Sequence, residues 1–163
     1  MRKRRQNTLR LLEATGGRRI ELPNLTIEDI ERAHKTGKLT LWTAKQNSYK
    51  TREIPIHRGW LEPISIFMDT HRRRLVKGLL EESIIEKDSG YLLLSSKGEK
   101  ISEETITREV NKLAKIAGIN EKACPHMFRH RFITIQVATR LKEYGKQELA
   151  IWAEAHRARR HRK

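Results

Sequence analysis

The spacing of its apolar residues limits what this chain can fold into more than any other feature. Over most of its length, apolar side chains recur every three to four residues, which is the period of an α-helix. Two segments alternate instead with period two, as half-buried strands do: Lys38–Thr43 and Thr51–Ile56. The polar segment Lys45–Lys50 between them predicts a long hairpin loop, and Ile30–Ala33 is a possible first strand. The pattern therefore predicts a mainly α fold with a small three-stranded antiparallel sheet.

The boundaries of the helices are marked by capping residues, glycines and prolines. The expected helices are one capped by Asn7 or Thr8 that stops at Gly16, one begun by Pro63 that breaks at Asp88, one capped by Ser102 that ends before Gly118, and one begun by Pro125. A chain of 163 residues is of ordinary length for one domain with a single core.

Positive charge is the second informative feature. The chain has 35 Lys and Arg residues against 20 Asp and Glu, a net charge of +15 at pH 7. Much of this excess lies near the two ends, and we expect residues 1–6 and 152–163 to be basic tails. Such an excess favours a polyanionic partner, most often nucleic acid, and no apolar run is long enough to span a membrane. The single cysteine, Cys124, excludes an intrachain disulfide and indicates a reducing compartment.

A group of polar residues near Pro125 is the first candidate site. His126 and Arg129 are three residues apart, so a helix places them on the same face. An imidazole beside a guanidinium suits a tetrahedral anion. The alternative is that His126 only caps the helix and Arg129 is a solvated surface residue. A zinc site made of Cys124, His126 and His130 is not expected, because the chain has no second cysteine to complete it.

The segment Thr15–Leu22 is the second candidate site. Its two glycines allow the backbone to bring the side chain of Arg18 into a cleft, and Glu21 has the spacing needed to orient that arginine. The alternative is an ordinary end of a helix followed by surface arginines. The chain lacks the motifs Gly-x-x-x-x-Gly-Lys-Ser/Thr, Gly-x-Gly-x-x-Gly and Gly-x-Ser-x-Gly, which argues against nucleotide binding and serine hydrolysis.

In this order, the segments resemble the catalytic domain of the tyrosine recombinases, the phage integrase family. The first box of that family is similar to Thr15–Leu22, its lysine-bearing hairpin to the stretch ending in Lys50–Ile56, and its second box, His-x-x-Arg, to Cys124–His130. The resemblance covers residues 11–139, which is most of the chain. Three boxes in the right order make it more specific than any one of them.

The resemblance implies an enzyme that cuts one DNA strand with a tyrosine hydroxyl and rejoins it through a 3′-phosphotyrosyl link, without metal or cofactor. Arg18 and Arg129 would clamp the phosphate oxygens in the transition state. His126 would accept a proton or donate a hydrogen bond to the phosphate. Lys45 would protonate the leaving 5′-oxygen, and Lys50 is the competing choice for this role.

The C-terminal part departs from the family pattern. Trp152 lies at the spacing of the third box, where some members carry tryptophan, but its surroundings lack the usual Leu-Gly-His form. The nucleophile is expected further along, at His161, and no tyrosine follows Tyr144, which is too close to Arg129 for that role. The family's N-terminal DNA-clamping domain is also not found. We therefore expect an incomplete catalytic domain at residues 7–151 whose nucleophile is missing from this chain.

The partners implied by the resemblance are double-stranded DNA and other protomers of a recombinase assembly, with no membrane. The implied location is the cytoplasm, at a bacterial nucleoid or in a phage-infected cell. The residues expected to contact DNA are Lys50, Arg52, Thr105, Arg108 and Lys112, the last three on the polar face of a helix that suits the major groove. Two other hypotheses remain: a non-enzymatic DNA-binding or regulatory module of this fold, and a basic RNA-associated protein. Only an enzyme would form covalent adducts with DNA.

Overall fold

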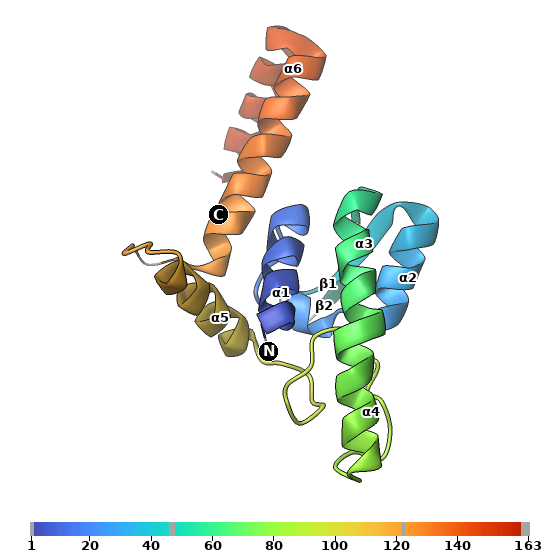
Figure 1. Ribbon diagram of the computed structural model, residues 1–163. Helices are drawn as coiled ribbons and strands as arrows, with labels where there is room; N and C mark the ends of the chain where they lie inside the picture. Colours follow the sequence, from blue (N-terminus) through green and yellow to red (C-terminus); the bar gives the residue numbers. More distant parts are fainter. Residues whose placement is uncertain (1, 46–47, 122, 161–163) are drawn as a thin grey trace.

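Six α-helices and one hairpin make up the part of the chain that the structure describes. This computed structural model describes residues 2–45, 48–121 and 123–160, and for 43–45, 48–50 and 143–160 it describes the backbone alone. The elements are α1 (Arg2–Thr15), the 3₁₀ turn η1 (Leu22–Asn24), α2 (Ile27–Thr36), β1 (Lys38–Lys45), β2 (Ser48–Pro55), α3 (Arg58–Phe67), the π-helical turn η2 (Met68–Arg72), α4 (Arg73–Glu81), α5 (Glu103–Ile116) and α6 (Pro125–Arg160). Helix α1 lies in the middle, between α3 on one side and α5 and α6 on the other (Figure 1).

The sheet formed by the described residues has two strands and not the predicted three. The segment predicted as the first strand, Ile30–Ala33, lies inside α2. Thr26 and Asp29 form a reciprocal capping box at the start of this helix: Asp29 N donates to Thr26 Oγ1 (3.1 Å), and Thr26 N donates to Asp29 Oδ2 (3.0 Å). The box satisfies free amides of the first turn, so it favours a helix where a short apolar run is ambiguous.

The hairpin is longer than predicted. β1 and β2 pair antiparallel from Lys38 opposite Pro55 to Lys45 opposite Ser48. Most of the predicted loop Lys45–Lys50 is therefore strand, because the residues that follow Ser48 include the tyrosine and threonine that strands favour.

Two helices begin earlier than predicted. α1 already includes residues 2–6, which are therefore helical rather than a tail, and Arg4 within them is buried. α3 begins at Arg58 with His57 as its N-cap, so Pro63 lies inside the helix instead of in its first turn. The predicted starts of the last two long helices are confirmed.

The hydrophobic core surrounds the buried face of α1 and extends under the hairpin. Its fully buried side chains lie between α1 and α5 in the sequence: Leu11, Leu12, Leu22, Leu25, Ile30, Leu39, Leu41, Leu61, Ile64, Leu92, Leu93 and Ile106. Each such side chain contributes on the order of 1.5–3 kcal/mol through burial. Within the described residues, no helix is both long and apolar enough to cross a membrane.

A buried ion pair joins α1 to α5. Arg4 Nε and Nη2 donate to Glu109 Oε1 at 3.1 and 2.5 Å, and Arg4 Nη1 donates to the carbonyl oxygen of Leu94 at 2.5 Å. Thr8 Oγ1 donates to the other oxygen of Glu109 at 3.3 Å. All three nitrogens of the buried guanidinium therefore have partners, and the pair fixes α5 against α1.

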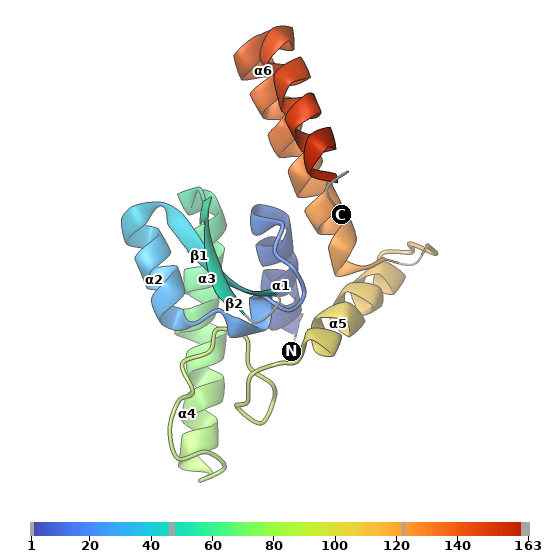
Figure 2. The same ribbon diagram turned by 180° about the vertical axis from the view of Figure 1, so that it is seen from behind.

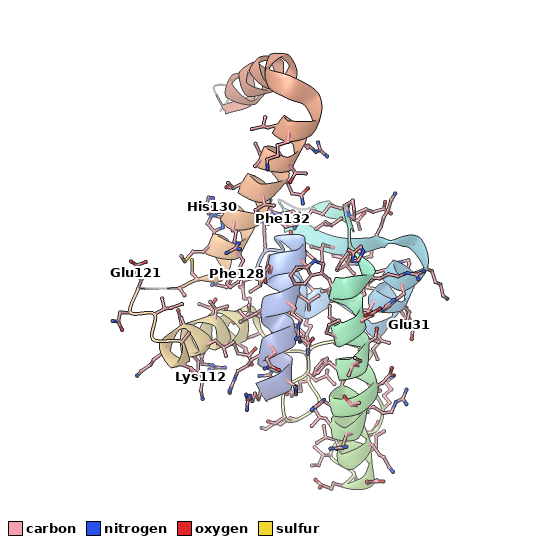
Figure 3. All side chains as sticks on the ribbon, turned by 45° about the horizontal axis from the view of Figure 1, so that its top comes forward. Glu31, Lys112, Glu121, Phe128, His130 and Phe132 are labelled. Atoms are coloured by element: carbon pink, nitrogen blue, oxygen red, sulfur yellow. The ribbon has the colours of Figure 1, made fainter. Side chains whose placement is uncertain are left out.

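Helix α6 starts beside α1 and continues beyond the rest of the molecule (Figure 2). Phe128 and Phe132 pack against the core from the side that faces α1, whereas His130 lies on the outer side (Figure 3). The helix runs to Arg160, so most of the predicted C-terminal tail 152–163 is helical.

Candidate functional site

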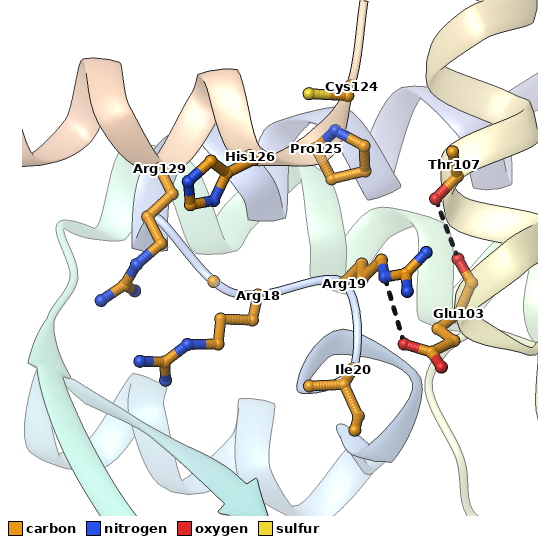
Figure 4. Close-up of a pocket in the computed structure, with 10 residues that line it drawn as sticks. Arg18, Arg19, Ile20, Glu103, Thr107, Cys124, Pro125, His126 and Arg129 are labelled. Atoms are coloured by element: carbon orange, nitrogen blue, oxygen red, sulfur yellow. Dashed lines mark hydrogen bonds and ion pairs between the residues drawn. The ribbon is translucent and has the colours of Figure 1, made fainter. Parts of the chain in front are cut away.

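A cavity of about 490 Å³ lies where the loop after α1, the start of α5 and the start of α6 meet. It brings together Arg18 from one candidate segment with His126 and Arg129 from the other. Its lining consists of Gly17, Arg18, Arg19, Ile20, Glu103, Thr107, Cys124, Pro125, His126 and Arg129 (Figure 4). The lining is rich in basic side chains, with two arginines from the loop and one arginine and one histidine from α6.

Arg18 is held by Glu21, as the sequence predicts. Arg18 Nη1 donates to Glu21 Oε1 at 2.8 Å, and the backbone N of Arg18 donates to Glu21 Oε2 at 2.9 Å. The Glu21 side chain is fully buried, while that of Arg18 is 42% exposed. The carboxylate therefore fixes one edge of the guanidinium and leaves the rest of it open to the cavity.

Arg129, from α6, is fixed to the same loop. Its Nη1 donates to the carbonyl oxygen of Gly16 at 2.9 Å. Gly16 follows α1 with a φ of +54°, a left-handed conformation that favours glycine. The guanidinium groups of Arg18 and Arg129 extend toward the same side of the cavity (Figure 4). His126 lies one turn before Arg129 in α6 and is exposed at the cavity edge.

A third arginine, Arg52, adds positive charge beside Arg18 and Arg129, although the sequence predicts that it contacts DNA. Arg52 Nη2, from β2, donates to Glu21 Oε2 at 2.6 Å. Burial lowers the pKa of Arg129, and the nearby charges of Arg18 and Arg52 lower it further, while Glu21 opposes them. For Glu21, burial raises the pKa, but hydrogen bonds from Arg52 and Arg18 outweigh it and bring the pKa below its ordinary value. The site is thus three guanidiniums around one carboxylate.

The wall opposite Arg129 is formed by an ion pair. Arg19 Nε lies 3.3 Å from Glu103 Oε2 in the first turn of α5, and Thr107 Oγ1 donates to the carbonyl oxygen of Glu103 at 3.4 Å (Figure 4). This pair links the loop that carries Arg18 to α5. The adjoining Cys124 is half-buried and unpaired as a thiol.

Several predicted site residues have backbones in the structure but side chains outside the described part. Lys45 is the last residue of β1, opposite Ser48, and Lys50 pairs with Thr43 in β2. Tyr144 and Trp152 both lie in α6. His161, at the predicted position of the nucleophile, lies outside the described residues altogether.

The predicted DNA-contacting face of α5 lies on the surface. Arg108 and Lys112 are exposed, and Arg108 Nη2 donates to Thr105 Oγ1 at 3.1 Å. The opposite face of the same helix is buried through Ile106 and Glu109. The amphipathic pattern read from the sequence therefore holds for this helix.

The chemistry available to the cavity is anion binding. Among the described residues, no group of three or more His, Cys, Asp and Glu side chains has the arrangement of a metal site. Guanidinium groups bind phosphate oxygens through charge-assisted, often bidentate hydrogen bonds. A cavity lined by Arg18, Arg129 and His126 is suited to a tetrahedral or pentavalent phosphate.

Relatives of known kind share both the sequence and the fold. The tyrosine recombinase XerD of Vibrio cholerae is 31% identical over 138 residues, 84% of this chain and 40% of the relative. The tyrosine recombinase XerC of Thermodesulfovibrio yellowstonii is 29% identical over 124 residues, 76% of this chain and 38% of the relative. This chain thus spans about 40% of the length of the curated relatives it matches.

Solved structures agree with the sequence relatives. The crystal structure of the XerA recombinase aligns with a TM-score of 0.63 and 26% identity, over 88% of this chain and 46% of that one. The XerH site-specific recombinase, bound to its difH substrate, shares the fold at a TM-score of 0.54 and 22% identity, over 85% of this chain and 36% of that one. Residues 1–150 match the phage integrase family itself. The chain therefore belongs to the phage integrase family and carries the tyrosine recombinase catalytic fold.

Proposed function

We propose that this chain is the phosphate-binding part of a DNA strand-cleaving and rejoining site. One observation carries the proposal: Arg18 and Arg129, from opposite ends of the chain, line one cavity together with His126. Unrelated surface arginines would have no reason to meet in this way. The two guanidiniums would hold the non-bridging oxygens of a DNA phosphate and stabilise the extra negative charge of its pentavalent transition state.

The proposed reaction has two balanced halves. In cleavage, a tyrosine hydroxyl forms a bond to phosphorus, the bond to the 5′-oxygen breaks, and a 3′-phosphotyrosyl link results. The leaving 5′-oxygen takes a proton from Lys45, with Lys50 as the alternative, and His126 accepts the tyrosine proton or donates a hydrogen bond to the phosphate. Rejoining reverses these steps. Trp152, at the third-box spacing, would complete the site.

Position 161, where the family spacing predicts the nucleophile, holds histidine. We propose that the attacking tyrosine comes from another protomer. Double-stranded DNA is the proposed substrate, with the exposed face of α5 (Thr105, Arg108 and Lys112) in the major groove and Lys50 near the backbone. XerH, which shares the fold, is seen bound to its own DNA substrate. The activity would place the protein in the cytoplasm, at a nucleoid or in a phage-infected cell.

The rejoining half can be tested without any tyrosine. A nicked duplex whose 3′ end carries a p-nitrophenyl phosphate mimics phosphotyrosyl DNA, and attack by the adjacent 5′-hydroxyl releases p-nitrophenolate and seals the nick. The duplexes are supplied as a pool in which the DNA sequence on both sides of the nick is randomised. We expect this chain to seal nicks in some members of that pool. Arg18→Ala and Arg129→Ala should each slow sealing by roughly 10²–10³-fold, the usual effect of removing one donor to the transition state.

A matched control is Arg73→Ala, because the Arg73 side chain is 75% exposed on α4 and its partner among the described residues is the exposed carboxylate of Asp69. It should seal at the wild-type rate. If the wild-type chain binds the duplex without releasing p-nitrophenolate, the enzymatic proposal fails and the alternative, a DNA-binding module of the same fold, takes its place.

A further inference from the structure

The second carboxylate oxygen of Glu21 accepts a hydrogen bond from Arg52, a residue that has no role in the proposed reaction. Oε1 accepts from Arg18 Nη1, whereas Oε2 accepts from the backbone of Arg18 and from Arg52 Nη2 at 2.6 Å. The carboxylate is fully buried and lies between two guanidiniums that come from the loop after α1 and from β2. The sequence predicts that Arg52 contacts DNA, but one of its nitrogens donates to Glu21.

Charge explains why a second arginine on this carboxylate matters. If Glu21 faced Arg18 alone, the negative charge would cancel the positive charge that a phosphate is meant to meet. With Arg52 present, the guanidiniums of Arg18, Arg52 and Arg129 exceed the carboxylate by two positive charges. A phosphodiester gains a second negative charge in its pentavalent transition state, so this excess matches it.

We propose that Arg52 is a positioning residue of the phosphate site, which acts by occupying Glu21 so that the free edge of Arg18 faces the phosphate. The inference rests on the proposed function and adds Arg52 to the residues that support it. Arg52 has a 29% exposed side chain, less than the 42% of Arg18, which fits a supporting role beside the cavity.

The main experiment separates this role from a direct contact with DNA. A residue that contacts a DNA phosphate contributes about one unit to the salt dependence of binding. Arg52→Gln should therefore leave the salt slope of duplex binding unchanged while it lowers the sealing rate at saturating DNA by about 10- to 100-fold, as expected for a misplaced guanidinium. Arg52→Lys keeps the charge and should recover most of the rate. A drop of one unit in slope with an unchanged rate would overturn the proposal.

A double-variant comparison tests the route through Glu21. In a Glu21→Gln background there is no carboxylate to occupy, so adding Arg52→Gln should change the sealing rate by less than about threefold. If Arg52→Gln costs as much in that background as in the wild type, Arg52 does not act through Glu21. Thermal unfolding of each variant checks that all of them are folded.

A readout independent of catalysis keeps the inference distinguishable from the proposed function. Inorganic phosphate is titrated against the side-chain Nε–H resonance of Arg18, and Arg52→Gln is expected to weaken phosphate binding about tenfold, with Arg73→Ala as the unchanged control. If the wild type binds phosphate in this way but seals no nicks, the proposed function fails while the inference stands. If Arg52→Gln alters neither phosphate binding nor sealing, the inference fails alone.

Discussion

Two buried carboxylates, Glu21 and Glu109, each hold arginines, but they leave those arginines in different states. At Glu109, the side chain of Arg4 is 10% exposed and each of its three guanidinium nitrogens donates a hydrogen bond. At Glu21, the side chain of Arg18 is 42% exposed and only one of its guanidinium nitrogens donates to the carboxylate. The first cluster is closed, and the second is open on one side.

The difference separates a stabilising contact from a binding site made with the same chemical groups. A closed pair exposes almost no donor to a ligand, because the Arg4 side chain is only 10% exposed, so its value lies in fixing α5 against α1. An open pair keeps N–H donors in a fixed direction and a net positive charge accessible at the surface. The stability of the surrounding fold offsets the cost of holding these charges close together. We therefore expect changes at Glu109 to act mainly on stability and changes at Glu21 and Arg18 mainly on phosphate chemistry.

The largest expected effect on stability comes from opening the closed cluster. Arg4→Ala leaves the carboxylate of Glu109 buried without its main partner, and removing one member of a buried pair costs about 3–5 kcal/mol. Urea unfolding followed by circular dichroism measures this loss. Replacing both members with Arg4→Met and Glu109→Leu should recover most of it, because no buried charge remains; a double variant as unstable as Arg4→Ala would contradict the account.

The next largest effect is expected at Gly16. A Cβ added there would lie 2.6 Å from Cδ1 of Phe132, and the φ of +54° disfavours any other residue. Gly16→Ala should cost about 1–3 kcal/mol through overpacking and backbone strain. It should also slow nick sealing, because Phe132 and Arg129 share α6. Gly37→Ala is the matched control: its φ is +69° with no atom within 4 Å, so strain acts there without the clash.

Acid should act on the open cluster through Glu21. The pKa of this carboxyl is lowered in the folded protein, so its stabilisation is complete above the ordinary pKa of 4.5 and is lost as the pH falls through the folded value. The difference in Tm between the wild type and Glu21→Gln should therefore be largest near pH 7 and shrink below pH 4.5. A Tm difference that grows on acidification would contradict the lowered pKa of Glu21.

The smallest effect on stability is expected at Arg18. Its side chain is largely solvated on one edge, and Arg52 remains to pair with Glu21 when it is removed. Arg18→Ala should therefore change the free energy of unfolding by less than about 1 kcal/mol, although it should abolish most of the nick sealing. Loss of stability as large as in Arg4→Ala would remove the distinction between the two clusters.

Local signals in the sequence predicted most helices. The resemblance to the tyrosine recombinases, and no local signal, implied that the two boxes meet, and neither predicted the long-range pairing of charges. The predicted strand Ile30–Ala33 is wrong because the capping box at Thr26 decides for a helix. Glu21 beside Arg18 was predictable from its spacing of three residues. The pairing of Arg4 with Glu109 spans 105 residues and depends on how α1 and α5 pack, which no local pattern encodes. For the same reason, the partner of Arg52 was missed.

The hydrogen bond from Arg129 to the carbonyl oxygen of Gly16 couples the packing of α6 against α1 to the affinity for phosphate. Arg129 can hold a phosphate beside Arg18 only in molecules in which α6 is docked on α1, so the apparent dissociation constant equals the intrinsic one divided by the docked fraction. By thermodynamic linkage, a bound phosphate must raise that fraction in return. Phosphate binding and the docking of α6 on α1 are therefore thermodynamically linked, and a change in one changes the other.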